Sequence, residues 1–150
     1  MSAGQAEGAA WTLDPRLDAD CHALGRLGQN RLLLMDNAQV PWFILVPQTS
    51  ATEFYQLEPE LQQAVLSDVN ALSAFIKDHF AVHKLNIAAI GNLVRQLHIH
   101  VIGRYVHDPY WPGVVWGAGP GPAYRADQIA PLRQALSRQF GARYQPAVAD

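Results

Sequence analysis

The chain has 150 residues with a formal net charge of −2, and 49% of its residues are hydrophobic while 16% are charged. This length and composition predict one globular domain over residues 1–150, with 1–10 as a flexible leader of small and polar residues. The weak net charge argues against binding to a nucleic acid polymer or a membrane, and neither a membrane-spanning segment nor a secretory signal stands out, so we expect a cytoplasmic protein.

Two short apolar segments early in the chain predict a pair of antiparallel strands. Residues 31–35 and 43–46 are mostly apolar, and Pro47 ends the second segment. Asp36 and Asn37 begin the polar connection between them. Both an ordinary turn and a ligand contact favour short polar side chains, so either role suits these two residues.

A long amphipathic helix is predicted next. Pro59 suits its first turn, and apolar residues then follow at spacings of three and four over about six helical turns. This stripe predicts a helix over 61–80 that packs on the core. Its apolar positions are Leu61, Val65, Val69, Leu72, Ile76 and Phe80.

The second half of the chain alternates between short elements and turns. A third strand is predicted over 86–90, Gly91 and Asn92 begin a tight turn, and a second helix is predicted over 127–140. The Pro- and Gly-rich segment 109–122 predicts an irregular loop. Neighbouring strands with few helices indicate an α+β fold with an antiparallel sheet.

The segment 96–102 carries the strongest functional signal. Its residues alternate between polar and apolar, so on a strand Gln96, His98 and His100 share one face. Two imidazoles and an amide on one face favour a functional site. The alternatives are a metal pair formed by the two histidines and an ordinary solvent-facing strand.

This segment resembles the signature of the histidine triad (HIT) superfamily, in which three histidines alternate with apolar residues. Gln96 stands where that signature has its first histidine, while His98 and His100 match the second and third. Several separated segments between residues 22 and 117 match the superfamily in the same order. The last of them, 104–117, is similar to a bacterial branch that resembles dinucleoside polyphosphate hydrolases.

The resemblance implies a fold and an assembly. The expected HIT-like fold is an antiparallel sheet of about five strands with one long helix packed on it and a C-terminal helix. HIT proteins commonly pair through a strand and a helix, so we expect a homodimer. Neither a cofactor nor a metal ion is implied.

The resemblance also implies a mechanism. In HIT enzymes the middle histidine, here His98, attacks the α-phosphate of a nucleotide and forms a nucleotidyl-histidine intermediate that water hydrolyses. His100 would contact the phosphate in the same pocket. Gln96 keeps a hydrogen-bond donor and acceptor but cannot carry a proton at neutral pH, so it is expected to support the site without delivering a proton.

Further residues are implicated in nucleotide binding by the same resemblance. Asp36 or Asn37 matches the residue that bonds the ribose hydroxyls, and a carboxylate at Asp36 would be the stronger acceptor. Asn86 and Asn92 match residues that support or contact the phosphates. Trp116 is a candidate for the base pocket.

The expected function is therefore that of a nucleotide-binding hydrolase or nucleotidyl transferase. Its substrate would be a dinucleoside polyphosphate, such as diadenosine tetraphosphate, or a nucleotidyl conjugate, cleaved at the α-phosphate. One alternative is a non-catalytic nucleotide-binding protein, because Gln96 replaces a histidine. Another is a metal-binding module built on His98 and His100, which lacks a further ligand nearby in the sequence. Among the other histidines, His22 needs inspection because its strand could approach the pocket.

Overall fold

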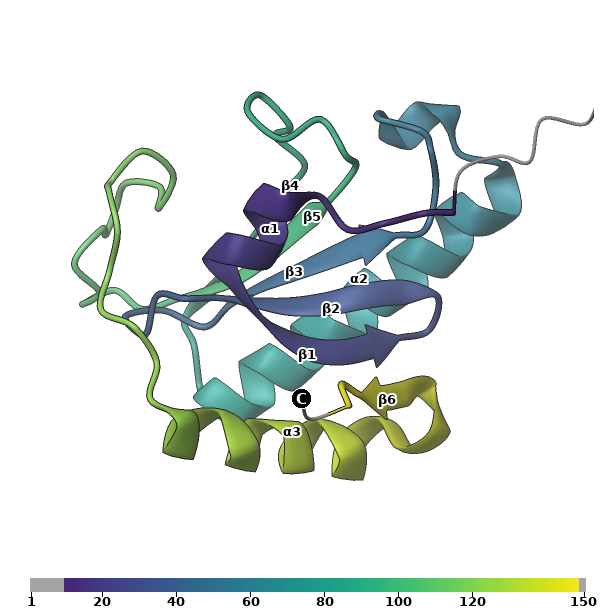
Figure 1. Cartoon of the computed structure of the whole chain (residues 1–150). Coiled ribbons are helices and arrows are strands. Elements are labelled where there is room, and N and C mark those ends of the chain that lie inside the picture. Colours follow the sequence, from purple (N-terminus) through teal and green to yellow (C-terminus); the bar gives the residue numbers. More distant parts are fainter. Residues whose placement is uncertain (1–9, 149–150) are drawn as a thin grey trace, which may run out of the picture.

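The sheet of this protein has six strands, all paired antiparallel, in the order β4-β5-β3-β2-β1-β6 (Figure 1). The computed structural model describes residues 10–148, so the predicted leader lies outside the described residues except for its last residue. Across these residues no helix is both long and apolar enough to cross a bilayer. The strands are β1 (Cys21–Leu27), β2 (Asn30–Met35), β3 (Trp42–Pro47), β4 (Lys84–Ala88), β5 (Ile99–Arg104) and β6 (Tyr144–Pro146). The helices are α1 (Pro15–Asp20), α2 (Pro59–Phe80) and α3 (Ala126–Phe140), with short 3-10 helices at Phe54–Gln56 and Gly141–Arg143.

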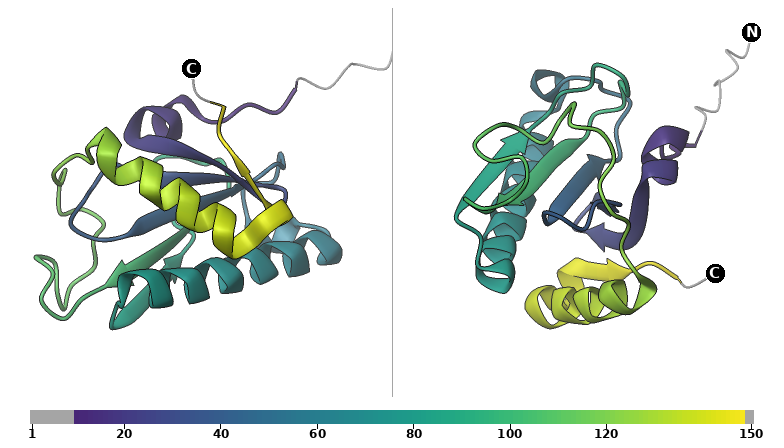
Figure 2. Two further views of the ribbon diagram at one scale, coloured as in Figure 1. Left: turned by 90° about the horizontal axis from the view of Figure 1, so that it is seen from below. Right: turned by 90° about the vertical axis from the view of Figure 1, so that its left-hand side faces the viewer.

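The two faces of the sheet pack against different partners. Side chains alternate along each strand, so Phe43 and Val101 belong to the core completed by α2 and α3. Ile44 and Ile102 belong to a second cluster, which includes Leu17 of α1 and residues of the loop after β5. Figure 1 shows α2 behind the sheet and α1 in front of it, and Figure 2 shows α3 alongside α2.

The predicted long helix is confirmed as α2, which begins two residues before the predicted start. Pro59 lies in its first turn, and the helix ends where Ala81 adopts a left-handed conformation with φ 51°. The predicted apolar stripe faces the sheet. Each large apolar side chain buried there contributes about 1.5–3 kcal/mol relative to exposure. The buried members of the stripe are Val65, Val69, Leu72 and Ile76, while Leu61 and Phe80 are partly buried.

The fold class is confirmed, with six strands in place of about five. The early strand pair is present as β2 and β3, and the C-terminal helix is present as α3. β4 begins and ends two residues before its predicted bounds. β5 begins at Ile99, so Gln96 and His98 lie just ahead of the strand and not on it.

Three elements have no clear signal in the sequence. In β1 the register shifts between Ala23 and Gly25, and such a bulge disturbs the alternation of side chains. β6 has only three residues. α1 has six residues and begins after an N-cap at Asp14, which is too short for a helical period to be visible.

Candidate functional site

Two adjoining cavities lie on the α1 side of the sheet. The larger has a volume of about 660 Å³ and is lined by His98, His100 and Trp116. The smaller has a volume of about 430 Å³ and is lined by Asp36 and Asn37. Volumes of this order suit a ligand of nucleotide size. The residues common to both walls are Asp20, Met35, Trp42 and Gly119.

His98 is held in one tautomer by the backbone. The side chain is only 6% exposed, and its Nδ1 lies 2.7 Å from the carbonyl oxygen of Gln96. A carbonyl oxygen can only accept, so Nδ1 carries the ring proton. In the neutral ring, Nε2 then keeps its lone pair. This is the tautomer that a nucleophilic imidazole requires.

His100 has the opposite arrangement of its ring nitrogens. The indole N–H of Trp42 donates to Nδ1 of His100 over 2.9 Å. Burial, and to a smaller extent the charge of His98, lower the pKa of His100 to about 4. The centroids of the two imidazole rings are 4.9 Å apart. At neutral pH, His100 is therefore uncharged and carries its proton on Nε2.

Gln96 uses both ends of its amide to hold the N-terminal segment. Its Oε1 accepts from the backbone N–H of Asp14 at 2.9 Å, and its Nε2 donates to the carbonyl oxygen of Thr12 at 2.8 Å. Gln96 lines neither of the two cavities, whereas α1, which begins directly after Asp14, contributes Leu17 to the larger one. The hydrogen bonds of Gln96 therefore act on the cavity wall through the N-terminal segment.

Asp36 lines the smaller cavity with a carboxylate that is held in place. Its Oδ1 accepts from the backbone N–H of Tyr124 at 2.8 Å and lies 2.8 Å from Nε2 of His22. Both hydrogen bonds lower the pKa of Asp36, and the bond from Tyr124 has the larger effect. The carboxyl group is therefore ionised at neutral pH. Its Oδ2 has neither of these partners. His22 thus approaches the pocket through Asp36.

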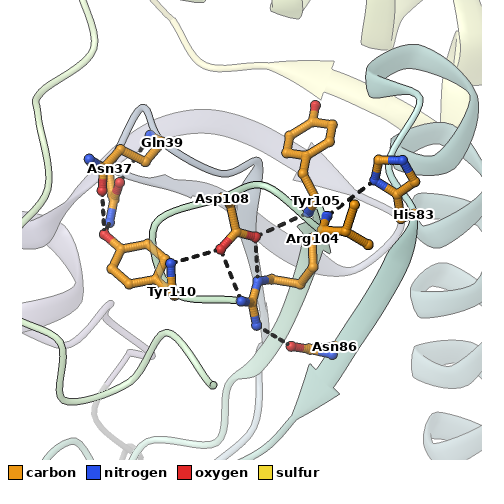
Figure 3. A network of polar contacts seen from close by, with 9 residues as sticks. Asn37, Gln39, His83, Asn86, Arg104, Tyr105, Asp108 and Tyr110 are labelled. Carbon is orange, nitrogen blue, oxygen red and sulfur yellow. Dashed lines mark hydrogen bonds and ion pairs between the residues drawn. The ribbon is translucent and has the colours of Figure 1, made fainter. Parts of the chain in front are cut away.

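Asn37 and Asn86 belong to a polar network around Arg104 (Figure 3). The buried Arg104 forms an ion pair with Asp108 at 2.8 Å and donates to Oδ1 of Asn86 at 2.9 Å. Asn37 is 4% exposed and donates to the hydroxyl of Tyr110 at 2.9 Å. Asn86 lines neither cavity. Both predicted amide contacts therefore have partners within the protein.

The loop after β5 brings Trp116 to the larger cavity. Asp108 fixes the start of this loop, because it accepts the backbone N–H groups of Tyr105 at 3.0 Å and Tyr110 at 2.9 Å. The ring of Trp116 then meets His100 edge-on, with centroids 5.4 Å apart. The indole N–H of Trp116 is buried and has no hydrogen-bond partner. Trp116 therefore contributes an aromatic wall beside the histidines.

Asn92 also lines the larger cavity, and it lies in the connection that follows β4. Gly91 precedes it with φ 67°, a conformation that favours glycine and supports the tight turn expected there. Leu93 and Val94 continue the same wall, which is apolar at these positions.

The predicted site residues divide into three groups. His98, His100, Asn92 and Trp116 meet at the larger cavity, Asp36 and Asn37 at the smaller, and Gln96 and Asn86 at neither.

Two further wall residues have no motif in the sequence. Asp20 and Trp42 line both cavities. Asp20 ends the unpredicted α1, so no pattern could reveal it. Trp42 begins β3, one residue before the predicted strand 43–46, and alternation with Phe43 places its side chain on the face away from α2.

A metal-binding arrangement is not present among residues 10–148, where no three His, Cys, Asp or Glu side chains are grouped to hold an ion. The metal-binding alternative therefore gains no support from the described geometry.

Comparison with known proteins gives a consistent picture. The HIT domain family model matches residues 16–107. Among solved structures, a histidine triad (HIT) protein from Marinobacter aquaeolei is 42% identical, with a TM-score of 0.83, covering 88% of this chain and 97% of that one. One from Sinorhizobium meliloti is 38% identical, with a TM-score of 0.82 and coverage of 86% and 96%. One from Bradyrhizobium japonicum is 36% identical, with a TM-score of 0.83 and coverage of 87% and 98%. No curated protein matches the chain.

Proposed function

This chain belongs to the HIT domain family, and on that premise we propose that it is a hydrolase or nucleotidyl transferase that cleaves a nucleotide conjugate at the α-phosphate. The observation that supports this function most directly is the tautomer of His98. With Nδ1–H bonded to the carbonyl oxygen of Gln96, the lone pair of Nε2 is available for attack.

The proposed reaction has two steps. First, Nε2 of His98 bonds to the α-phosphorus, and the bond from phosphorus to the leaving group breaks. The leaving group keeps the electron pair and takes a proton from water where it needs one. The carbonyl of Gln96 stabilises the positive charge that develops on the ring, and Nε2–H of His100 donates to a non-bridging phosphate oxygen. Water, or another acceptor in a transferase, then attacks the phosphorus, and the bond from phosphorus to Nε2 breaks. Its electron pair returns to the ring of His98, and the proton of the attacking group passes to solvent.

Asp36 is the proposed ribose contact. Its Oδ1 is used by His22 and Tyr124, which leaves Oδ2 to accept from the ribose hydroxyls. Asn37 is less suited to this role, because its amide is buried and bonded to Tyr110. In this arrangement the exposed Asn92 contacts the phosphates and Trp116 forms an aromatic wall.

The charge of the cavity walls favours one class of substrate. Asp20 and Asp36 line the cavities, and no lysine or arginine does so among the described residues. Arg95 lines a further hollow of about 40 Å³, which shares His98 with the larger cavity. A long polyphosphate would bring several negative charges, and the linings of these two cavities offer it no cationic side chain. We therefore place a nucleotidyl conjugate with one phosphate, such as a phosphoramidate, ahead of a dinucleoside polyphosphate.

The replacement His98→Ala tests this function. Wild-type protein incubated with an adenosine phosphoramidate should show an adenylyl adduct by intact-mass measurement, and His98→Ala should show none. Turnover should fall by several orders of magnitude because the attacking atom is gone, while nucleotide binding persists. The exposed His107→Ala is the control and should behave as wild type. Wild-type protein that binds nucleotide without adduct or turnover would instead be a non-catalytic binder.

A homodimer is part of the proposal. β4 is the outer strand of the sheet beside β5, so its other edge carries unpaired backbone groups, and Ile87 on it is 50% exposed. An open edge of this kind pairs readily with another strand. Light scattering should report twice the chain mass of 16.5 kDa. A monomer at all working concentrations would contradict the dimer.

A further inference from the structure

The indole of Trp42 lies against the imidazole of His100 because of how β3 pairs with β5. Ile44 is opposite His100 in this ladder, and Trp42 is opposite Ile102. Trp42 is therefore a diagonal neighbour of His100 on the same face of the sheet. Both side chains are buried, at 8% and 5% exposure.

The bond between the two rings has only one possible direction. An indole N–H can donate but cannot accept, so the nitrogen that it meets must be unprotonated. That nitrogen is Nδ1 of His100, at 2.9 Å. The proton of the neutral imidazole must then reside on Nε2, the nitrogen left for the cavity.

We infer that Trp42 is a positioning residue that fixes His100 in the Nε2–H tautomer, so that His100 donates a hydrogen bond to the phosphate throughout the reaction. In the opposite tautomer, Nε2 would present a lone pair to the phosphate oxygens and repel them. This role rests on the proposed function, but the tautomer itself is a property of the protein without substrate.

Among residues 10–148, no second group duplicates this role. Trp116 also contacts His100, but its indole N–H has no hydrogen-bond partner and so cannot select a tautomer. His98 meets His100 ring to ring, and the Nδ1 proton of His98 is already given to Gln96. The burial that lowers the pKa of His100 to about 4 keeps the ring neutral at pH 7. Only a neutral imidazole has two tautomers, because the charged ring carries a proton on both nitrogens.

Nuclear magnetic resonance of the wild-type protein gives the first test. Nitrogen-15 spectra of the imidazoles near pH 7 should show His100 with an unprotonated Nδ1 and a protonated Nε2, and His98 with the reverse. The replacement Trp42→Phe keeps an aromatic ring and removes the donor. It should convert His100 to a mixture of tautomers while leaving that of His98 unchanged.

The matched control is Trp116→Phe, which removes an indole from the other side of the same imidazole. It should leave the tautomer of His100 unchanged, whatever it does to KM. With an adenosine phosphoramidate, Trp42→Phe should lower kcat about tenfold with little change in KM, as expected for the loss of one oriented hydrogen bond.

The inference is overturned if wild-type His100 carries its proton on Nδ1, which needs no variant, or if Trp42→Phe leaves the tautomer as it was. It is also overturned if Trp42→Phe changes the tautomer without lowering kcat. If wild-type protein forms no nucleotidyl adduct with any nucleotide conjugate, the proposed function fails, while the wild-type spectrum still decides whether Trp42 sets the tautomer.

Discussion

Each imidazole at the cavity has one ring nitrogen bonded within the protein and one left for a ligand. His98 donates from Nδ1 to the carbonyl of Gln96, whereas His100 accepts at Nδ1 from Trp42. Two side chains of the same type are therefore held with opposite proton positions. In the proposed reaction, the first presents a lone pair for attack and the second an N–H that stabilises charge on the phosphate.

Replacing Gln96 by histidine should not create a general acid. The amide of Gln96 bonds to Thr12 and Asp14 and lines neither cavity, so an imidazole there would meet the N-terminal segment. We expect turnover of a phosphoramidate and of a dinucleoside polyphosphate to change by similar small factors in steady-state kinetics. A well-placed acid would contribute about a hundredfold to ten-thousandfold. A gain confined to the amine leaving group would show that position 96 reaches that group.

The companion replacement Gln96→Glu separates the two bonds of the amide. A carboxylate still accepts from Asp14 but cannot donate to Thr12. We expect faster amide hydrogen exchange over residues 12–20 and a higher KM, because this segment supports the cavity wall. The adduct at His98 should still form.

The sequence reveals those parts of the site whose residues lie close together along the chain. His98 and His100 are two residues apart, so alternation alone predicts that they act together. Trp42 is 58 positions from His100, and Gln96 is 84 from Thr12. Only the pairing of β3 with β5 brings the first pair together, and no local pattern specifies that register.

At the scale of elements, one buried ion pair determines how the chain leaves β5. Arg104 and Asp108 have side chains only 2% and 1% exposed. Asp108→Asn keeps the shape but leaves the guanidinium without its counter-charge, so the free energy of unfolding should fall by about 3–5 kcal/mol. Urea denaturation measures this change. The loop that carries Trp116 should also loosen, which would raise KM.

An exposed ion pair supplies the control for this replacement. Arg125 and Asp127 are 3.0 Å apart with side chains 71% and 72% exposed. Such pairs contribute little, so Asp127→Asn should leave the free energy of unfolding nearly unchanged. Equal effects of the two replacements would contradict a special role for the buried pair.

The elements themselves were predictable in proportion to their length. α2 repeats its apolar stripe over 22 residues, so its period is clear. β6 has three residues and pairs with β1, which lies more than a hundred positions earlier in the chain. α1 is held by Asp14 and Gln96, a contact that only the folded chain contains.

For the whole molecule, the α+β class can be predicted from the short strands that neighbour one another in the sequence. The order of the strands in the sheet cannot be predicted in this way. β5 inserts between β4 and β3, which precede it by different distances along the chain. That insertion places His100 on an inner strand of the sheet, with His98 just ahead of the strand. Because His100 is buried within the fold, its protonation should change the free energy of unfolding of the whole molecule.

Acid should destabilise the molecule in two pH ranges. The pKa of His100 is lowered by burial from 6.5 to about 4, so between these values the unfolded chain binds a proton that the folded chain does not. The free energy of unfolding should therefore fall as the pH is lowered from 6.5 to about 4, by roughly 3 kcal/mol at most. At lower pH, Asp36 and Asp108, whose pKa values are lowered by their hydrogen bonds, protonate and cause a further loss.

Urea denaturation at a series of pH values separates the two ranges. His100→Gln removes the titrating ring, so the decline between pH 6.5 and 4 should become shallower while the decline at lower pH remains. His107→Gln, which changes an exposed histidine, should keep the wild-type dependence. If His100→Gln and the wild type lose stability in parallel above pH 4, the buried neutral imidazole is not the source of that dependence.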